Sequence, residues 1–173
     1  ARTSTLRVLA APPFMHGAAH WNAISGWLAG GTVVVQDQPT RLDPADVLGV
    51  AERERVTSLL IVGDAFARPL VDELHRRPYD LSSLRFLLTG GAVLSAPVKA
   101  ELLSLLPDLQ IVDVLGSSET GRQGVHRSNR ARGASTGTFD RSPTSRVLSA
   151  DRTRVLEPGG RIGIALRQSA GAS

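Results

Sequence analysis

Hydrophobic and polar positions follow two different periods along the first two-thirds of the chain. Short runs that are apolar nearly throughout are typical of buried strands, and they are separated by stretches with apolar residues every three or four positions, typical of helices. The expected strands are 6–11, 32–35, 58–62, 84–88 and 110–115, and the expected helices are 16–28, 43–55, 64–76 and 95–106. This alternation predicts an α/β fold with a mostly parallel sheet flanked by helices.

Local start and stop signals support these helices. Asp43 precedes Pro44 and Asp46, a combination of side-chain cap, proline in the first turn and early acid that favours a helix start. Asp64 and Ser95 are the expected caps of the two later helices. Each expected strand–helix pair is therefore bounded by residues that suit its ends.

The pattern changes after Gly121. Residues 122–143 are rich in Arg, Gly, Ser and Thr without strand or helix periodicity, and are expected to form a long loop. Two expected strands at 145–149 and 161–167, joined by a turn at 157–160, predict the start of a small antiparallel β-subdomain. The expected organisation is an α/β subdomain over 1–121, a loop over 122–143 and an incomplete β-subdomain over 144–173.

Composition excludes several classes of protein. The chain has 173 residues, 42% of them hydrophobic and 21% charged, as in an ordinary soluble domain. It has no cysteine, so disulfides and thiolate metal sites are excluded. The most apolar stretch covers residues 24–35, whereas a membrane-spanning helix needs about 20 apolar residues. No charged and apolar leader opens the sequence. These features predict a cytoplasmic protein without a transmembrane segment.

The net charge of +4 comes from arginines, several of which lie between Arg122 and Arg146. A basic segment of this kind can bind nucleic acid. However, aromatic residues make up only 4% of the chain and do not alternate with the arginines, as base stacking would require. Nucleic acid is therefore not the expected partner.

The segment Gly116-Ser117-Ser118-Glu119-Thr120-Gly121 directly follows an expected buried strand. Glycines allow a ligand to approach the backbone, hydroxyl groups donate to phosphate oxygens, and a carboxylate can hold Mg²⁺. Ligands of open α/β sheets bind beyond the carboxyl ends of the strands, which favours a nucleotide-phosphate site here. The alternative is an ordinary turn rich in glycine and serine.

Two other strand ends carry similar residues, at 12–16 and 89–92. If the strands are parallel neighbours, all three turns open on the same edge of the sheet.

His16 and His20 are four residues apart, but no third ligand supports a zinc site. Trp21 has the spacing of a core residue and is expected in the core more than in a pocket. The chain contains no nucleophile elbow, Walker-type loop or dinucleotide-binding fingerprint.

Three motifs together resemble a known family. They are Ala11-Pro12-Pro13-Phe14-Met15-His16-Gly17, Thr89-Gly90-Gly91-Ala92-Val93-Leu94 and Leu115-Gly116-Ser117-Ser118-Glu119-Thr120-Gly121. In this order and spacing they are similar to those of the AMP-forming acyl-CoA synthetases of the adenylate-forming superfamily, specifically the bacterial fatty-acyl type. The similarity covers residues 6–166.

The resemblance implies a site and a reaction. Such enzymes activate a carboxylic acid with ATP to acyl-AMP, using Mg²⁺, and then transfer the acyl group to CoA. Ser118 would contact the α-phosphate and Glu119 would bind Mg²⁺, while His16 and Trp21 would line the acyl pocket; His16, Ser118 and Glu119 would form the catalytic set. The nucleotide would contact Gly90, Gly91, Ala92, Leu115, Gly116, Ser117 and Ser118.

The chain also departs from the family pattern. The family's phosphate loop precedes the position of His16, and its ribose-binding aspartate and catalytic lysine follow the position of Gly163. Leu115 replaces a tyrosine, and Arg161 stands where a glutamate is usual. The resemblance therefore implies a central fragment that is inactive alone.

Two other functions stay open at this point. One is a non-catalytic α/β module that binds a nucleotide or an acyl ligand. The other is nucleic-acid binding through residues 122–146, which is the weaker of the two. Neither the acid that is activated nor the oligomeric state follows from the sequence.

Overall fold

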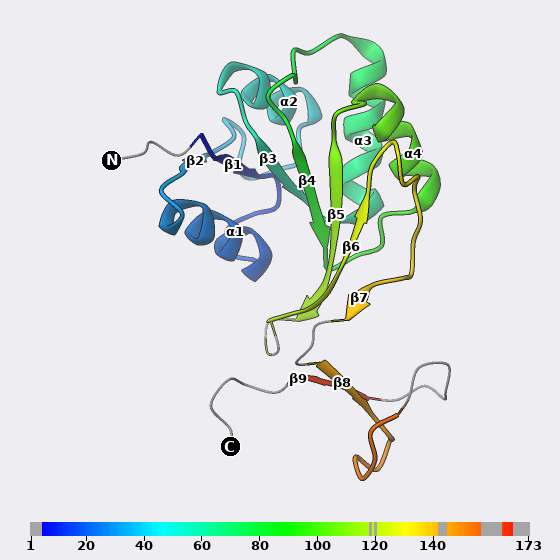
Figure 1. Ribbon diagram of the computed structural model, residues 1–173. Coiled ribbons are helices and arrows are strands. Elements are labelled where there is room, and N and C mark those ends of the chain that lie inside the picture. Colours follow the sequence, from blue (N-terminus) through cyan, green and yellow to red (C-terminus); the bar gives the residue numbers. More distant parts are fainter. Residues whose placement is uncertain (1–4, 118, 120, 142–144, 157–163, 168–173) are drawn as a thin grey trace.

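The computed structural model describes residues 5–117, 119, 121–141, 145–156 and 164–167. Its centre is a seven-stranded sheet with the order β2-β1-β3-β4-β5-β6-β7 (Figure 1). The first five of these are mutually parallel, and β6 and β7 are antiparallel to their neighbours. The strands are β1 (Arg7–Ala10), β2 (Thr32–Val34), β3 (Ser58–Ile61), β4 (Phe86–Gly90), β5 (Gln110–Ser117), β6 (Gly121–Ser128) and β7 (Asp140–Arg141).

Helices cover both faces of this sheet, as expected from the sequence. Three of them, α2 (Pro44–Arg53), α3 (Gly63–Arg76) and α4 (Ala96–Leu105), lie on one face (Figure 1). The helix α1 (Gly17–Leu28) lies on the opposite face, against β1 and β2. The prediction of a mostly parallel sheet flanked by helices is confirmed.

The core follows from the two-residue period of the strands. Leu9, Leu59 and Leu87 point to the side of α2, α3 and α4 and belong to the main buried cluster. The next residues along β1 and β3, Ala10 and Leu60, point to α1 and form a smaller cluster with Ala19. Because both faces are covered, these strands are apolar nearly throughout.

The starts of α2 and α4 agree with the sequence, whereas the expected cap at Asp64 is wrong. Asp43 caps α2 by accepting from the backbone N–H of Asp46 at 3.3 Å. Ser95 is the N-cap residue of α4, although its side chain makes no capping hydrogen bond. Asp64 lies in the first turn of α3, where its carboxylate accepts from the backbone N–H of Ser95 at 2.8 Å. Burial acts to raise the pKa of Asp64, but hydrogen bonds from Ser95 and Arg68 outweigh it and leave that pKa below its ordinary value. Asp64 therefore joins two helices instead of capping one.

The expected loop over 122–143 is wrong at both ends, because β6 and β7 lie there. Both faces of β6 are only partly buried, so its sequence lacks apolar alternation. Its position is set by antiparallel pairing with β5, in a register that shifts between Leu115 and Gly116. Backbone hydrogen bonds between strands carry no signature in the side chains, which explains the wrong prediction.

The antiparallel strands expected near the C-terminal end are confirmed. β8 (Ser145–Leu148) and β9 (Ile164–Arg167) form a two-stranded sheet. The expected turn at 157–160 and Arg161 lie outside the described residues. The division of the chain into subdomains stays a prediction.

Truncating Leu59 tests the core. This side chain in β3 is 2% exposed, so Leu59→Ala removes packed methyl groups and leaves a cavity. We expect the free energy of unfolding to fall by about 2–5 kcal/mol in urea denaturation. Leu28→Ala, at a residue that is 80% exposed, is the matched control, with an expected change of about 0.5 kcal/mol or less. Equal losses in the two variants would contradict this core.

Candidate functional site

The chemistry-bearing turns follow parallel strands and therefore lie at one edge of the sheet. β1, β3, β4 and β5 run in the same direction, so their carboxyl ends meet there. Two cavities open at this edge, and they share the backbone of Gly90, Gly91 and Gly116 with Thr89 and Val114 as a common wall. This is the position at which open α/β sheets bind their ligands.

The first cavity lies between the 89–94 turn, β5 and the segment 136–139, and has a volume of about 310 Å³. Two glycines leave part of its wall without side chains. A Cβ on Gly90 would lie 2.9 Å from the carbonyl oxygen of Val114, and Gly91 has a φ of +80°, which side-chain-bearing residues rarely adopt. The wall is therefore bare backbone, against which a flat ring can lie.

A buried ion pair supports the first cavity. Lys99, the chain's single lysine, is 1% exposed on α4, and its ammonium lies 2.8 Å from the Asp113 carboxylate on β5. The same ammonium donates to the backbone carbonyl of Ser135 at 2.6 Å. One side chain thus connects a helix, a central strand and the segment that closes the cavity.

Two further hydrogen bonds hold that segment in place. The Ser135 hydroxyl lies 2.8 Å from Nε2 of His126 on β6, and the Thr136 hydroxyl donates to the carbonyl of Leu94 at 3.0 Å. Together with Lys99, these contacts hold residues 135–136 in place, and Thr136 lines the cavity.

The second cavity lies between α1 and the sheet and has a volume of about 400 Å³. Trp21, Asn22 and Ser25 line it from α1, and Leu60 and Leu88 line it from the strands. Its volume falls within the usual range of small-molecule sites, about 300–1,000 Å³. An elongated apolar ligand suits these walls.

Glu119 lies in the turn between β5 and β6 and is exposed. Hydrogen bonds from its own backbone N–H and from the Ser117 hydroxyl hold the pKa of Glu119 below its ordinary value. The carboxylate is therefore ionised at neutral pH. Within the described residues no group of three potential metal ligands occurs, but Mg²⁺ bound to a nucleotide needs only one or two protein carboxylates. Glu119 fits that requirement.

The structure brings most of the predicted site residues together. The first cavity is lined by Gly90, Gly91, Ala92, Leu115 and Gly116. The second is lined by Trp21 and Ser117 and shares the three glycines with the first. His16 is exposed at the N-cap of α1 and is not among the lining residues of either cavity. Ser118 and Thr120 lie outside the described residues.

Four titratable residues that line the cavities were not assigned to the site by the sequence analysis: Lys99, Asp113, His126 and Arg122. A signal existed for the first two. Lys99 has the spacing of the buried stripe of α4, with Leu102 and Leu103, and Asp113 interrupts an apolar strand. Opposite charges at two buried positions indicate a pair. His126 and Arg122 carried no such signal, because β6 was not expected.

The architecture and the two cavities together define an α/β protein of the class with glycine-rich turns at the carboxyl edge of a parallel sheet, the edge at which such proteins bind their ligands. The model of the family described as "AMP-binding enzyme" matches residues 1–168. The chain belongs to this family.

Curated relatives agree with the family. Over 153 residues the chain is 40% identical to a medium-chain acyl-CoA ligase of Mycobacterium avium, covering 88% of the chain and 28% of that relative. It is also 31% identical over 163 residues to a 3-oxocholest-4-en-26-oate–CoA ligase of Rhodococcus rhodochrous, covering 90% of the chain and 29% of the relative. The chain thus spans less than a third of the length of either relative.

Solved structures share the fold. One is a nonribosomal peptide synthetase protein with adenylation and PCP domains, with a TM-score of 0.72 and 26% identity, covering 94% of this chain and 29% of that one. A long-chain-fatty-acid–CoA ligase from Archaeoglobus fulgidus has a TM-score of 0.67 at 17% identity, covering 90% of this chain and 33% of that one. Among the described residues, no helix has the length and apolar character needed to cross a membrane.

Removing the Lys99 ammonium tests the support of the first cavity. Lys99→Met leaves the Asp113 carboxylate buried without its partner, and we expect a loss of about 3–5 kcal/mol in the free energy of unfolding. The double variant Lys99→Met/Asp113→Leu is the control, because it removes both charges and should recover most of that loss. Urea denaturation measures both, and an unchanged stability of Lys99→Met would contradict the pair.

Proposed function

We propose that this chain forms the adenylate-binding part of an AMP-forming acyl-CoA ligase that activates a fatty or related carboxylic acid with ATP and CoA. The observation that carries the proposal is the pair of cavities on either side of one glycine wall. A ligase of this type must hold a nucleotide and an acid next to each other, and adjacent cavities with a shared rim suit that need. The names of the curated relatives support the same reaction.

The first cavity suits the adenine ring. Its wall at Gly90, Gly91 and Ala92 is backbone, and Leu115 offers an apolar surface beside it. The second cavity suits the acyl chain, because Trp21, Leu60 and Leu88 are apolar. We assign His16 to the entrance of this acyl pocket on the basis of its family motif, and its exposed position on α1 leaves it accessible to a substrate.

The reacting phosphate would then lie near the turn that joins β5 and β6. Glu119 would hold the Mg²⁺ that accompanies ATP, which neutralises part of the phosphate charge, and Ser117 and Ser118 would donate to phosphate oxygens. In the first half-reaction a carboxylate oxygen forms a bond to the α-phosphorus while the bond to pyrophosphate breaks. In the second, the CoA thiol displaces AMP. Positioning the acid and compensating charge are the contributions of these residues.

ATP and CoA are abundant in the cytoplasm, and we propose that location.

The described residues supply no lysine for the phosphates, because the single lysine of the chain is paired with Asp113. This observation favours a second candidate for the chain by itself, namely a module that binds nucleotide or acyl ligand without turnover.

A pyrophosphate-release assay tests whether the chain by itself turns over. With ATP, Mg²⁺ and a panel of fatty acids, we expect the 173-residue chain to show negligible turnover, because it supplies no free lysine for the phosphates. Robust release by this chain would contradict the binding-only expectation and establish it as a ligase in its own right.

The role of Glu119 predicts how magnesium affects ATP binding. Mg²⁺ should tighten ATP binding by the parent chain in calorimetry, and Glu119→Gln should reduce this gain by about five- to ten-fold, because the amide lacks the charge that holds the metal. Glu101→Gln is the matched control, since Glu101 contacts His75 on α3 and lines neither cavity. Equal magnesium dependence in the parent and in Glu119→Gln would count against the metal assignment.

A further inference from the structure

The second cavity contains one charge without a counter-charge. Among the described residues that line it, Arg122 alone is ionic, and the remaining walls are apolar or neutral. In the part of the chain that the structure describes, the guanidinium of Arg122, an exposed residue, makes no ion pair or hydrogen bond. Arg127, on the same strand, instead donates to the Gln110 side chain at 3.2 Å. An apolar cavity with one unmatched cation fits an anion with an apolar body.

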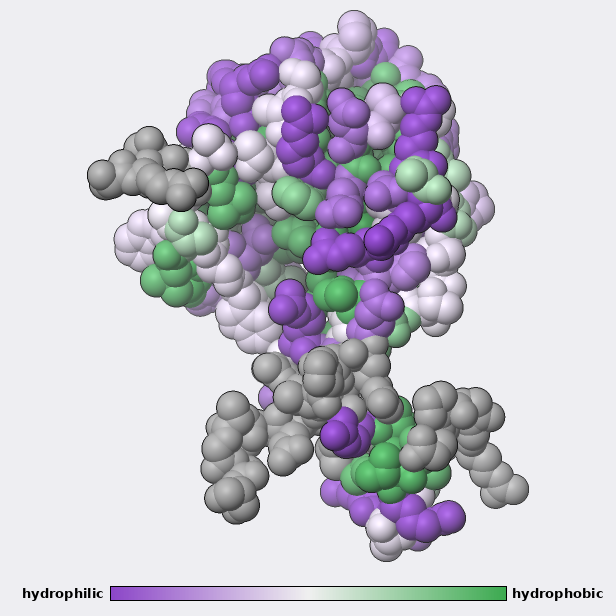
Figure 2. Space-filling model, viewed as in Figure 1, coloured by the Kyte–Doolittle hydropathy of each residue, from purple (hydrophilic) through white to green (hydrophobic). Residues whose placement is uncertain are grey.

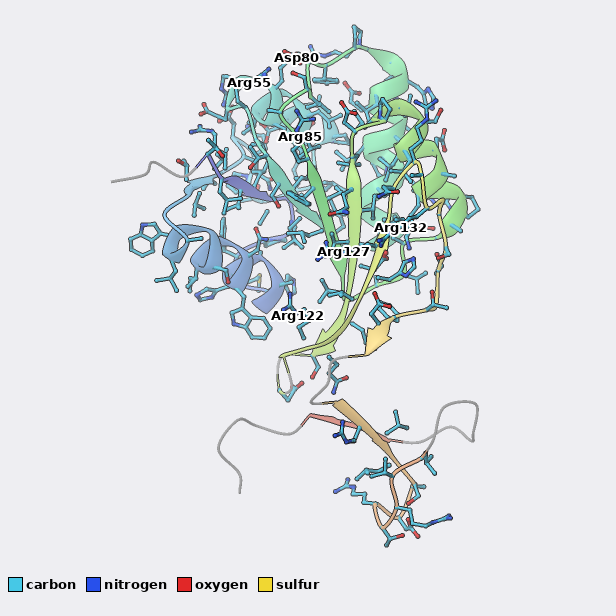
Figure 3. All side chains as sticks on the ribbon, in the orientation of Figure 1. Arg55, Asp80, Arg85, Arg122, Arg127 and Arg132 are labelled. Atoms are coloured by element: carbon cyan, nitrogen blue, oxygen red, sulfur yellow. The ribbon has the colours of Figure 1, made fainter. Side chains whose placement is uncertain are left out.

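The position of Arg122 within the cavity is defined by the strand pairing. It lies opposite Gly116 in the register of β5 and β6, next to Ser117 and Gly121, at the carboxyl edge of the sheet. Figure 3 shows its side chain on the part of β6 that lies toward α1. Leu60 and Leu88 line the cavity from within the sheet. The cation therefore marks one end of the cavity and the apolar residues continue from it.

A second polar group in the same cavity lacks a partner. The side-chain oxygen of Asn22, on α1, is buried and accepts no hydrogen bond. A buried acceptor without a donor costs free energy unless a ligand or water satisfies it. The helix side of the cavity can thus satisfy a polar substituent of a ligand that Arg122 holds at its anionic end.

We propose that Arg122 binds the carboxylate of the acid substrate and orients its hydrocarbon chain along Leu60 and Leu88. The inference rests on the proposed function and assigns a substrate-binding residue within it. A guanidinium presents parallel N–H donors that match the two oxygens of a carboxylate. It also offsets the repulsion between that anion and the nucleotide phosphates near Glu119. Arg122 thereby selects free acids over neutral compounds of the same length.

Binding measurements with decanoate and with 1-decanol test this role. In calorimetry, Arg122→Gln should weaken decanoate binding about ten-fold and leave 1-decanol binding unchanged, because only the acid loses a charge-assisted hydrogen bond. Arg122→Lys should restore part of the decanoate affinity. Arg127→Gln, which changes the net charge equally on the same strand, should have no effect on either ligand.

AMP binding distinguishes failure of this inference from failure of the proposed function. The role of Arg122 is overturned if the parent, Arg122→Gln and Arg127→Gln bind decanoate equally, or if the parent does not bind decanoate. If the same samples still bind AMP, the proposed adenylate site is retained. A selective loss of decanoate in Arg122→Gln supports the role of Arg122. If the parent then does not bind AMP, the proposed adenylate function is rejected, whereas the carboxylate site at Arg122 is retained.

Discussion

The parallel pairing of β1, β3, β4 and β5 is the constraint on which the rest of the structure depends. Parallel neighbours need a crossover, and here a helix leads each strand back to the same starting edge. All carboxyl ends therefore meet at one edge, and the glycine turns at 89–92 and 116–121 become neighbours although they are far apart in the chain. Both cavities exist because these turns share a rim.

The two faces of the sheet are covered unequally, and this difference gives each cavity its character. Three helices pack over one face (Figure 1). A buried Lys99–Asp113 pair, which lines the first cavity, joins the last of them to β5. Among the described residues, one helix covers the other face, against β1 and β2, so space remains between it and the ends of β4 and β5. Apolar residues such as Trp27, 72% exposed, lie on this helix. Figure 2 shows one face of the molecule, where hydrophilic and hydrophobic residues are interspersed.

Much of the architecture could be predicted because its signals are local. Apolar runs such as 58–61 are buried on both faces, and the Asp43–Pro44 start lies entirely within five residues of sequence. The strand β6 could not be predicted in the same way, because its Arg- and Gly-rich sequence is held by backbone pairing with β5. The error at Asp64 has a similar cause: its carboxylate finds its partner 31 residues away.

The amino-acid sequence by itself determined the α/β class, the order of the elements and the three family motifs, since each depends on the period of side chains or on adjacent residues. Only the tertiary structure decided which of these residues share a cavity. It brought Lys99 to Asp113 and Ser135, left His16 exposed outside the cavity walls, and placed Arg122 in the lining of the second cavity. The physical reason is that strand register and helix packing, which join distant segments, set the surroundings of each charge.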